Sequence, residues 1–375
     1  MFKRISFLFF LSFFMLTMFA GCGDGLYKEE TVAGNNVYVG GFSINVSDVK
    51  VPGYWKNKVW NSLTPIDVAR NSQVNSIFVT TDSRVYAGGY STSTTSIMTP
   101  GYWFNGTWTA LVPGVTTKDA AVSSMFVDSN GKIYAAGYTT SAIDKKVPGY
   151  WLDGVWTALT TLEGKNSEVY SLTVAGGNVY AVGYDTKTVS GADVKVPTYW
   201  YNGTRTELAR IYTDKVGEAF GVSIAGGEVY IAGYNVDTAT NVKTPCYWKN
   251  NVLTQLTNGL SSTKDAYAKA ITVANGHIYV AGYGLSSGVN DASTNRPFVW
   301  TDGVWLEYSR IQSTTSGGLN HTYGVAIDVT SEGRVYVAGY SDLYAGFWRD
   351  SLLETLPPLY TTKAAQALSI FITAN

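Results

Sequence analysis

The sequence predicts an all-β protein, a seven-bladed β-propeller made of four-stranded antiparallel blades. One phrase of roughly 48 residues occurs seven times, each copy holds a strand-like Val/Ile-Tyr-x-small-Gly-aromatic segment, and short Gly/Asn turns separate the apolar runs. Repeats of about 40 to 50 residues with strand content are typical of propeller blades. The anchoring tyrosines, 46 to 57 residues apart by subtraction, are Tyr38, Tyr86, Tyr134, Tyr180, Tyr230, Tyr279 and Tyr336.

The first 36 residues are interpreted as a targeting segment and a tether. Lys3 and Arg4 precede an apolar run from residue 5 to residue 20, which has the length of a signal peptide rather than of a membrane-spanning helix. The run ends in Phe19-Ala20-Gly21-Cys22, which resembles the lipobox of bacterial lipoproteins. The alternative is a plain secretory signal with a chance cysteine.

The lipobox resemblance implies that Cys22 is acylated and becomes the new N-terminus. It divides the chain into a signal peptide (1–21), a lipidated tether (22–36) and the propeller (37–375). Two or three acyl chains would hold the protein firmly on a membrane, since each buried CH₂ contributes about 0.8 kcal/mol. Gly23 stands where an Asp retains many such lipoproteins in the inner membrane, so we expect a cell-envelope protein of the outer membrane, with the leaflet left open.

Each copy predicts four strands in a fixed order. The first is of the Ser-Ile-Phe-Val type, the second carries the Gly-aromatic phrase, the third holds a Tyr-Trp pair, and a turn such as Asn105-Gly106 leads into the fourth. Gly and Asn turns are what tight hairpins require. The predicted first strands are 76–79, 124–127, 171–174, 221–224, 270–273 and 326–329.

The chain ends predict how the ring closes. The first copy starts at its second strand, at Val37, and the chain ends with a complete first strand at residues 369–372. We therefore expect the C-terminal strand to pair beside residues 37–63, because closure removes open sheet edges. Residues 31–34 are a rival for this place, but Glu29 and Glu30 stand where other copies have a serine and a buried leucine.

The repeat is similar to kelch propellers and to the GNVYVAGY-type repeats of secreted bacterial propellers, over residues 37–375. The doublets Gly40-Gly41 and Gly88-Gly89 match the kelch Gly-Gly pair, whereas later copies have Ala or Val before the second glycine. The resemblance implies a fold and says little about function, because propellers serve many functions.

Residues that recur in every copy are interpreted as packing residues. All 11 tryptophans fall in two columns. One glycine column is expected to allow a close backbone approach or a bulge, and Cys246 takes a small-residue position. The first tryptophan column is Trp55, Trp103, Trp151, Trp200, Trp248, Trp300 and Trp348, and the glycine column is Gly41, Gly89, Gly137, Gly183, Gly233, Gly282 and Gly339.

Several function classes find no support in the sequence. A net charge of −1 without a Lys/Arg run argues against nucleic acid as a partner. His277 and His321 fall in different copies and on opposite predicted faces, which disfavours a shared metal site. Asp302-Gly303 matches a sialidase Asp-box only in part. We therefore predict no cofactor, no metal and no catalytic residue.

Variation between copies predicts the candidate binding face. The residue that leads into each first strand is expected at the mouth of the central channel, and it reads Gln366, Gln73, Ala121, Glu168, Glu218, Tyr267 and Tyr323 around the ring. The last four would form an acidic and aromatic arc in consecutive blades, with Lys118, Asp119, Lys264 and Asp265 just outside it. The competing interpretation is a solvated rim without a ligand.

We therefore expect a membrane-anchored extracytoplasmic lipoprotein that binds a protein or a glycan through this face. One alternative is a propeller glycoside hydrolase or lyase that uses Glu168 and Glu218, although no basic or histidine residue is expected beside them. Another is a structural scaffold in an envelope assembly complex, like the propeller lipoprotein of outer-membrane barrel assembly, a likeness of architecture alone.

Overall fold

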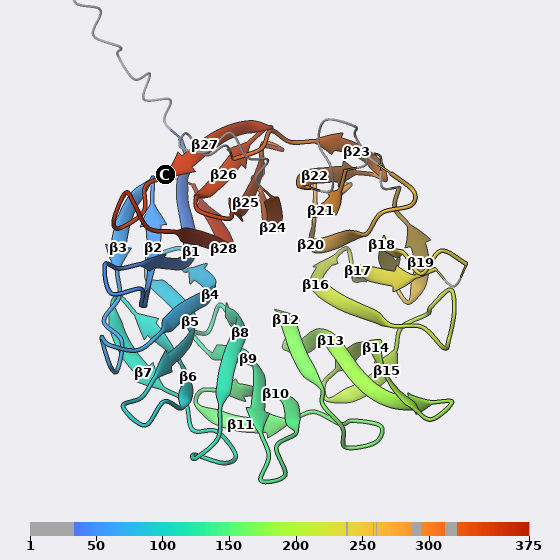
Figure 1. Ribbon diagram of the computed structural model, residues 1–375, viewed down its shortest axis with the longest axis horizontal. Coiled ribbons are helices and arrows are strands. Elements are labelled where there is room, and N and C mark those ends of the chain that lie inside the picture. The colour runs from blue at the N-terminus through green and yellow to red at the C-terminus, as the bar shows by residue number, and fades with distance from the viewer. Residues whose placement is uncertain are drawn as a thin grey trace, which may run out of the picture. The chain divides into compact units, whose positions relative to one another are not determined.

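The computed structural model describes residues 34–374, apart from 238, 258, 260, 287–293 and 312–320. Seven four-stranded antiparallel sheets follow one another around a ring (Figure 1). The predicted signal peptide and Cys22 lie outside the described residues. Within the described ranges no helix is long and apolar enough to cross a membrane.

The blades are numbered along the chain, and the innermost strand of each is given first. Blade 1 is β28 (Ala365–Thr373), β1 (Asn36–Ile44), β2 (Lys50–Lys56) and β3 (Val59–Ser62). Blade 2 is β4 (Ser72–Val79), β5 (Val85–Thr92), β6 (Met98–Phe104) and β7 (Thr107–Ala110). Blade 3 is β8 (Ala120–Val127), β9 (Ile133–Thr140), β10 (Lys146–Leu152) and β11 (Val155–Ala158). Blade 4 is β12 (Glu168–Ala175), β13 (Asn178–Val189), β14 (Ala192–Tyr201) and β15 (Thr204–Glu207).

The remaining blades repeat the same order. Blade 5 is β16 (Gly217–Ala225), β17 (Glu228–Val236), β18 (Lys243–Lys249) and β19 (Val252–Gln255). Blade 6 is β20 (Ala266–Ala274), β21 (His277–Leu285), β22 (Asn295–Thr301) and β23 (Val304–Glu307). Blade 7 is β24 (Thr322–Val329), β25 (Val335–Ser341), β26 (Ala345–Arg349) and β27 (Leu352–Leu356).

The C-terminal strand closes the ring, as the sequence predicts. Strand β28 pairs antiparallel with β1, with Ile370 opposite Val39, and forms the inner strand of blade 1. Blade 1 is therefore built from both ends of the propeller, which leaves no unpaired inner strand at the junction.

A bulge in the inner strand of every blade explains the glycine column. In blade 4 the register between β12 and β13 shifts between Val169 and Ser171, which leaves Tyr170 without a partner across the sheet. A Cβ on Gly183 would meet the carbonyl oxygen of Glu168 at far less than 3.0 Å. The other six blades repeat the shift and the close approach, so the sequence prediction is confirmed.

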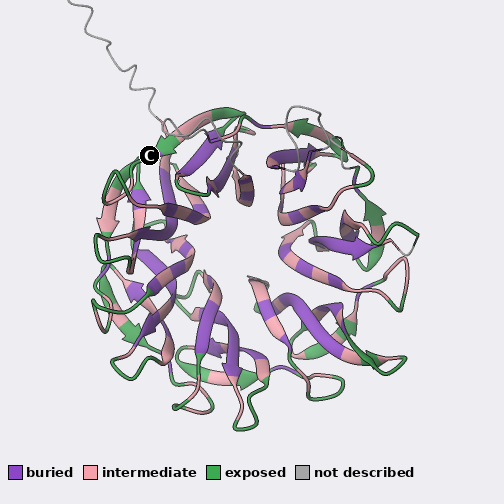
Figure 2. Cartoon of the chain, viewed as in Figure 1, coloured by how far each residue is buried: buried purple, intermediate pink, exposed green. Residues whose placement is uncertain are grey.

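The first tryptophan column joins neighbouring blades. All seven indoles are at most 1% exposed. Each Nε1 donates a hydrogen bond to a carbonyl oxygen at the outer end of the preceding blade, as from Trp103 to Thr64 at 2.8 Å and from Trp55 to Pro357 at 2.7 Å. Figure 2 shows the buried residues gathered within the sheets and the exposed ones on the outer strands and loops. The column is structural, as predicted.

The hairpin turns and Cys246 also serve packing. In the turn before each outermost strand, an Asn or Asp has positive φ and accepts a hydrogen bond from the second strand, as Asp302 does from the Ile278 backbone N–H at 2.9 Å. Cys246 is buried, and its sulfur accepts a hydrogen bond from Asn235 at 3.2 Å.

The long blade 4 connection around Asp185 is not a loop, because β13 and β14 extend through it as a paired hairpin.

Candidate functional site

The seven predicted rim residues occupy equivalent places. Each pairs across the sheet with the aromatic residue that follows the recurring glycine of the second strand, as Glu168 pairs with Tyr184 and Tyr323 with Tyr340. This pairing lies at the bulged end of the inner strand, next to the ring axis (Figure 1). Glu168, Glu218, Tyr267 and Tyr323 therefore lie at one end of four consecutive blades. We call this stretch the inner rim.

Tyrosine rings connect blades 5 to 7 along the inner rim. The ring of Tyr267 lies 5.3 Å from that of Tyr234 and 5.0 Å from that of Tyr283, measured between centroids. Tyr323 continues the series, at 4.9 Å from Tyr283 and 5.0 Å from Tyr340. We call Tyr267, Tyr283, Tyr323 and Tyr340 the tyrosine arc. All four are partly exposed, although Lys243 Nζ lies 5.0 Å from the centroid of the Tyr267 ring and His321 stacks on Tyr323 at 6.2 Å.

A column of lysines, which the sequence analysis missed, covers the aromatic rings of other blades. Lys146 Nζ lies 3.9 Å from the centroid of Tyr138, and Lys195 Nζ lies 4.0 Å from that of Tyr184. Such cation–π contacts contribute about 0.5–1 kcal/mol at exposed sites. The expectation that no basic residue joins Glu168 and Glu218 is wrong, because each of these lysines reaches the rim residue of the next blade.

Glu168 and Glu218 are both held by donors. Glu168 accepts from Lys146 Nζ at 2.8 Å. Glu218 accepts from the hydroxyls of Tyr170 and Tyr234, each at 2.8 Å, and lies 3.4 Å from Lys195 Nζ. Burial, and then the charge of Glu218, raise the pKa values of both tyrosines. The two tyrosines therefore stay protonated and remain donors.

The lysine column is interrupted in blade 2, where Met98 takes the position, and it ends before blades 6 and 7. In blade 5 the corresponding Lys243 donates to the hydroxyl of Tyr267 at 2.7 Å. In blade 6 the position is Asn295, and in blade 7 the tight connection at 341–344 replaces it. No lysine of the described residues therefore lies over Tyr283 or Tyr340. The inner rim has a charged part over blades 4 and 5 and an open aromatic part over blades 6 and 7.

The four predicted flanking residues serve mainly the fold. Asp119 and Asp265 accept hydrogen bonds from the backbone N–H groups of Met98 and Lys243, both at 2.9 Å, and so fasten one blade to the next. Lys118 pairs with Asp144 at 2.5 Å. Asn71 and Asn166 accept the equivalent backbone hydrogen bonds in other blades, from the N–H groups of Lys50 and Lys146. Recurrence therefore assigns the two aspartates to structure.

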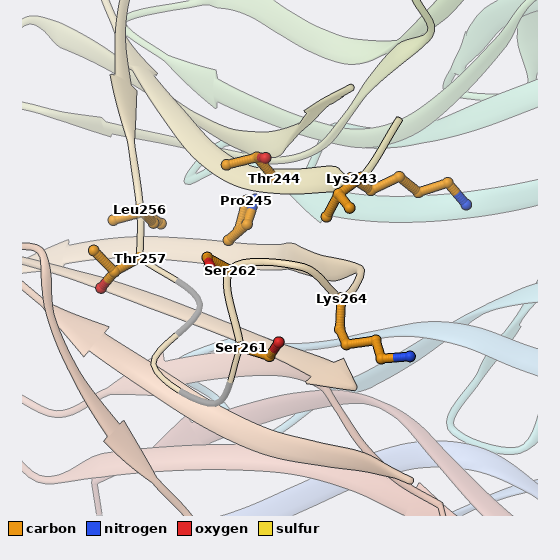
Figure 3. Close-up of a pocket in the computed structure, with 9 residues that line it drawn as sticks. Lys243, Thr244, Pro245, Leu256, Thr257, Ser261, Ser262 and Lys264 are labelled. Atoms are coloured by element: carbon orange, nitrogen blue, oxygen red, sulfur yellow. The ribbon is translucent and has the colours of Figure 1, made fainter. Parts of the chain in front are cut away.

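Lys264 lines a pocket of about 290 Å³ outside the inner rim, together with Pro245 and Leu256. Figure 3 shows the side chains of Lys243 and Lys264 extending in the same direction, away from Leu256. A pocket of about 200 Å³, lined by Leu111 and Lys118 among others, lies at the equivalent place between blades 2 and 3. The pocket is thus a product of the repeat, and we do not assign it a ligand.

The two histidines lie apart, His277 as the first residue of β21 and His321 directly before β24. His277 pairs with Asp302 at 2.6 Å, whereas His321 Nδ1 accepts from the Asn295 backbone N–H at 3.1 Å. Across the described ranges, no group of three His, Cys, Asp or Glu side chains is placed to hold a metal ion.

Comparisons with known proteins support the fold alone. No family model matches the chain, and no curated protein matches it. The β-propeller domain of the Trilobed protease from Pyrococcus furiosus superposes with a TM-score of 0.53 and 9% identity, over 88% of this chain and 94% of that domain. That domain is described as having an open velcro topology, whereas β28 closes the ring here.

Two further solved structures are similar to the chain at lower scores. The α-L-arabinanase of Penicillium chrysogenum, complexed with arabinobiose, has a TM-score of 0.49 and 13% identity over 91% of this chain and 98% of that one. The acylaminoacyl peptidase of Pyrococcus horikoshii has a TM-score of 0.49 and 10% identity over 85% of this chain, which spans 50% of that one. This chain is a seven-bladed β-propeller, and its function has to be argued from its own inner rim.

Proposed function

We propose that the protein is a lipid-anchored binding propeller of the cell envelope that captures a partner on the inner rim of blades 4 to 7. Of the two partner classes, a glycan and a protein, we favour the glycan. The observation that carries this proposal is the tyrosine arc. The fold has a lysine over the equivalent ring in blades 1, 3, 4 and 5. Blade 2 has Met98 at this position, and blades 6 and 7 are the two neighbouring blades without a lysine over their rings, Tyr283 and Tyr340, among the described residues.

The chemistry of the arc suits a sugar. A tyrosine face is negative and its hydroxyl both donates and accepts hydrogen bonds. A pyranose offers C–H groups on its face and hydroxyls on its edge, so it uses both properties. The nearby carboxylates Glu168 and Glu218 and the ammonium of Lys243 supply polar groups that would fix its orientation.

The binding proposal is tested with a glycan array and matched tyrosine variants. Tyr323→Ala removes the centre of the arc, and the control Tyr201→Ala removes a tyrosine that is 41% exposed at the opposite end of β14. We expect the wild type and Tyr201→Ala to bind the same glycans, and Tyr323→Ala to bind them at least about tenfold more weakly. Equal binding by all three proteins would contradict the site.

The membrane anchor is a separate part of the proposal and rests on the sequence around Cys22. Cys22→Ser should abolish labelling by a radioactive fatty acid and move the protein from the membrane to the soluble fraction. Fatty-acid labelling that persists in Cys22→Ser would refute acylation at this residue. Protease treatment of intact cells then separates a surface protein, which is degraded, from one that faces the periplasm.

A glycoside hydrolase or lyase remains the second candidate, because Glu168 and Glu218 lie in adjacent blades and Tyr170, on the strand of Glu168, donates to Glu218. The donors that hold both carboxylates make them better suited to binding than to proton transfer. Turnover of an oligosaccharide that disappears in Glu168→Gln, with binding retained, would favour the enzyme. A scaffold role would instead predict stable co-purification with an envelope complex and no glycan binding.

A further inference from the structure

We propose that the ligand is an acidic glycan, a uronic-acid oligosaccharide whose carboxylate pairs with Lys269 while its sugar rings lie on the tyrosine arc. This inference deepens the proposed function and rests on it. It identifies the chemical class of the glycan and a residue that selects it.

Lys269 stands at the bulge of β20, where the register shifts between Ala268 and Ala270. The bulge residue has no partner across the sheet, and its strand is the innermost of the blade. The equivalent residues of the other blades carry no charge: Asn75, Ser123, Tyr170, Phe220, Val325 and Leu368. Six blades fold without a charge here, so the fold does not require the lysine of blade 6.

The ammonium of Lys269 lacks an anionic partner. Its Nζ lies 3.2 Å from the centroid of the Phe220 ring, and no hydrogen bond or ion pair to it is found among the described residues. The carboxylate whose negative charge acts on the Lys269 ammonium is that of Glu218. That carboxylate is already bound by Tyr170, Tyr234 and Lys195.

Burial lowers the pKa of Lys269 to about 8, and the charge of Glu218 opposes this change only in part. The strands packed against β20 are β16, β17, β18, β21 and β24. The titratable groups toward the inner-rim end of these strands, and of β20 itself, are Glu218, Tyr234, Lys243, Tyr283, Tyr323 and Tyr267, whereas Asp328 lies toward the opposite end of β24. A ligand carboxylate would supply the missing counter-charge and raise the pKa of Lys269.

The tyrosine arc favours a glycan over an acidic peptide as the source of that carboxylate. Tyr267 belongs to the same strand as Lys269, two residues before it, and Tyr283 and Tyr323 continue the arc from there. A uronic acid carries a carboxylate on a ring whose C–H face can lie on a tyrosine. A flexible acidic peptide would satisfy Lys269 and leave the open aromatic faces unused.

Calorimetric titration of the full-length protein in detergent tests this inference. The probes are tetramers of galacturonate, mannuronate and glucuronate, each compared with its methyl ester, which has the same sugar without the charge. We expect at least one acidic tetramer to bind about tenfold or more tightly than its ester at pH 6.5. Lys269→Met should abolish this difference, and Lys249→Met, on the far end of β18, should retain it.

The pH dependence gives a second readout. The free ammonium has a pKa of about 8 and the paired one a higher pKa, so affinity for the acidic tetramer is full below pH 7 and falls as the pH rises through 8. Lys269→Arg keeps the charge at all these pH values, and its affinity should stay constant from pH 7 to 9. Melting curves check that each variant is folded.

The outcomes separate this inference from the proposed function. Equal binding of acid and ester, or a charge preference that survives in Lys269→Met, overturns the acidic ligand but leaves a glycan-binding rim. Binding of oligoglutamate without binding of any uronic tetramer overturns the glycan and indicates an acidic peptide. If no acidic tetramer binds while Tyr323→Ala loses neutral glycans from the array, only the present inference fails.

Discussion

The indole of each first-column tryptophan links two blades through a hydrogen bond, whereas Trp108, of the second tryptophan column, only packs. Trp103 Nε1 donates to the Thr64 carbonyl, and Trp108, whose ring centroid lies 4.4 Å from that of Trp103, has no partner for its Nε1 among the described residues. The same residue type in one blade therefore has two different roles.

Substituting each of these tryptophans with phenylalanine should separate the roles. Trp103→Phe leaves a buried carbonyl unsatisfied and loses packing, and we expect a loss of about 3 kcal/mol in the free energy of unfolding. Trp108→Phe removes a donor that has no partner, and should cost about 1 kcal/mol. Urea denaturation measures both values. Equal losses would show that the hydrogen bond contributes little.

Asp328 carries a pH-dependent contribution to stability. Burial raises its pKa to about 6, although its carboxylate accepts from the backbone N–H groups of Ile372 and Val329. A raised folded-state pKa means that the native state holds the proton more tightly than the unfolded chain. The contribution is therefore full below pH 4 and is lost as the pH rises through 6.

The variant Asp328→Asn should remove this dependence. From pH 4 to pH 7 the free energy of unfolding of the wild type should fall relative to that of the variant by about 2 kcal/mol. This value is somewhat smaller than a pKa shift of about two units would give, because the side chain is partly exposed. Urea denaturation at both pH values measures the difference. A constant difference between the two proteins would mean that Asp328 titrates normally.

At the scale of the strand, the bulge sets the direction of the inner-rim residues. The bulge lets the rim residue pair with the second-strand aromatic while the next residues point toward the blade interior, as buried Val169 does after Glu168. The glycine of the second strand allows this geometry because any Cβ would strike the rim carbonyl.

We expect Gly183→Ala to move Glu168 and to destabilise the protein by about 2 kcal/mol or more, since the atom in the way is backbone and cannot rotate aside. Gly114→Ala is the matched control, because its Cβ would meet only Thr139 Oγ1 at 3.8 Å and its φ is not positive. Thermal melting of both variants decides the matter. An unchanged melting temperature in Gly183→Ala would refute the role of the glycine.

The sequence predicts the elements well and the site only in part, for a physical reason. Recurrence marks packing, so strands, tryptophans, glycines and turns could be assigned from one chain. The same argument hid Tyr283 and Tyr340, which we propose as binding residues, because their column is aromatic in every blade. Lys146 and Lys195 lie 22 and 23 residues before their glutamates, on another blade, and only the ring geometry brings them together.

At the scale of the whole molecule, a seven-fold repeat has been made asymmetric on one rim. Blades 1 to 3 present Gln366, Gln73 and Ala121 where blades 4 to 7 present Glu168, Glu218, Tyr267 and Tyr323. The scaffold is the same in all seven, since each has the bulge, the glycine and the tryptophan contact. Differences in rim chemistry on a common scaffold are what a binding face requires.

Hydrogen exchange of the backbone amides, with and without the glycan that the array ranks first, tests the central claim most directly. The account predicts slower exchange on ligand binding at the inner-rim ends of β20, β21, β24 and β25, and no change at the opposite turns around Gly203 and Gly303. Protection confined to those opposite turns, or to blades 1 to 3, would contradict the assignment of the binding face.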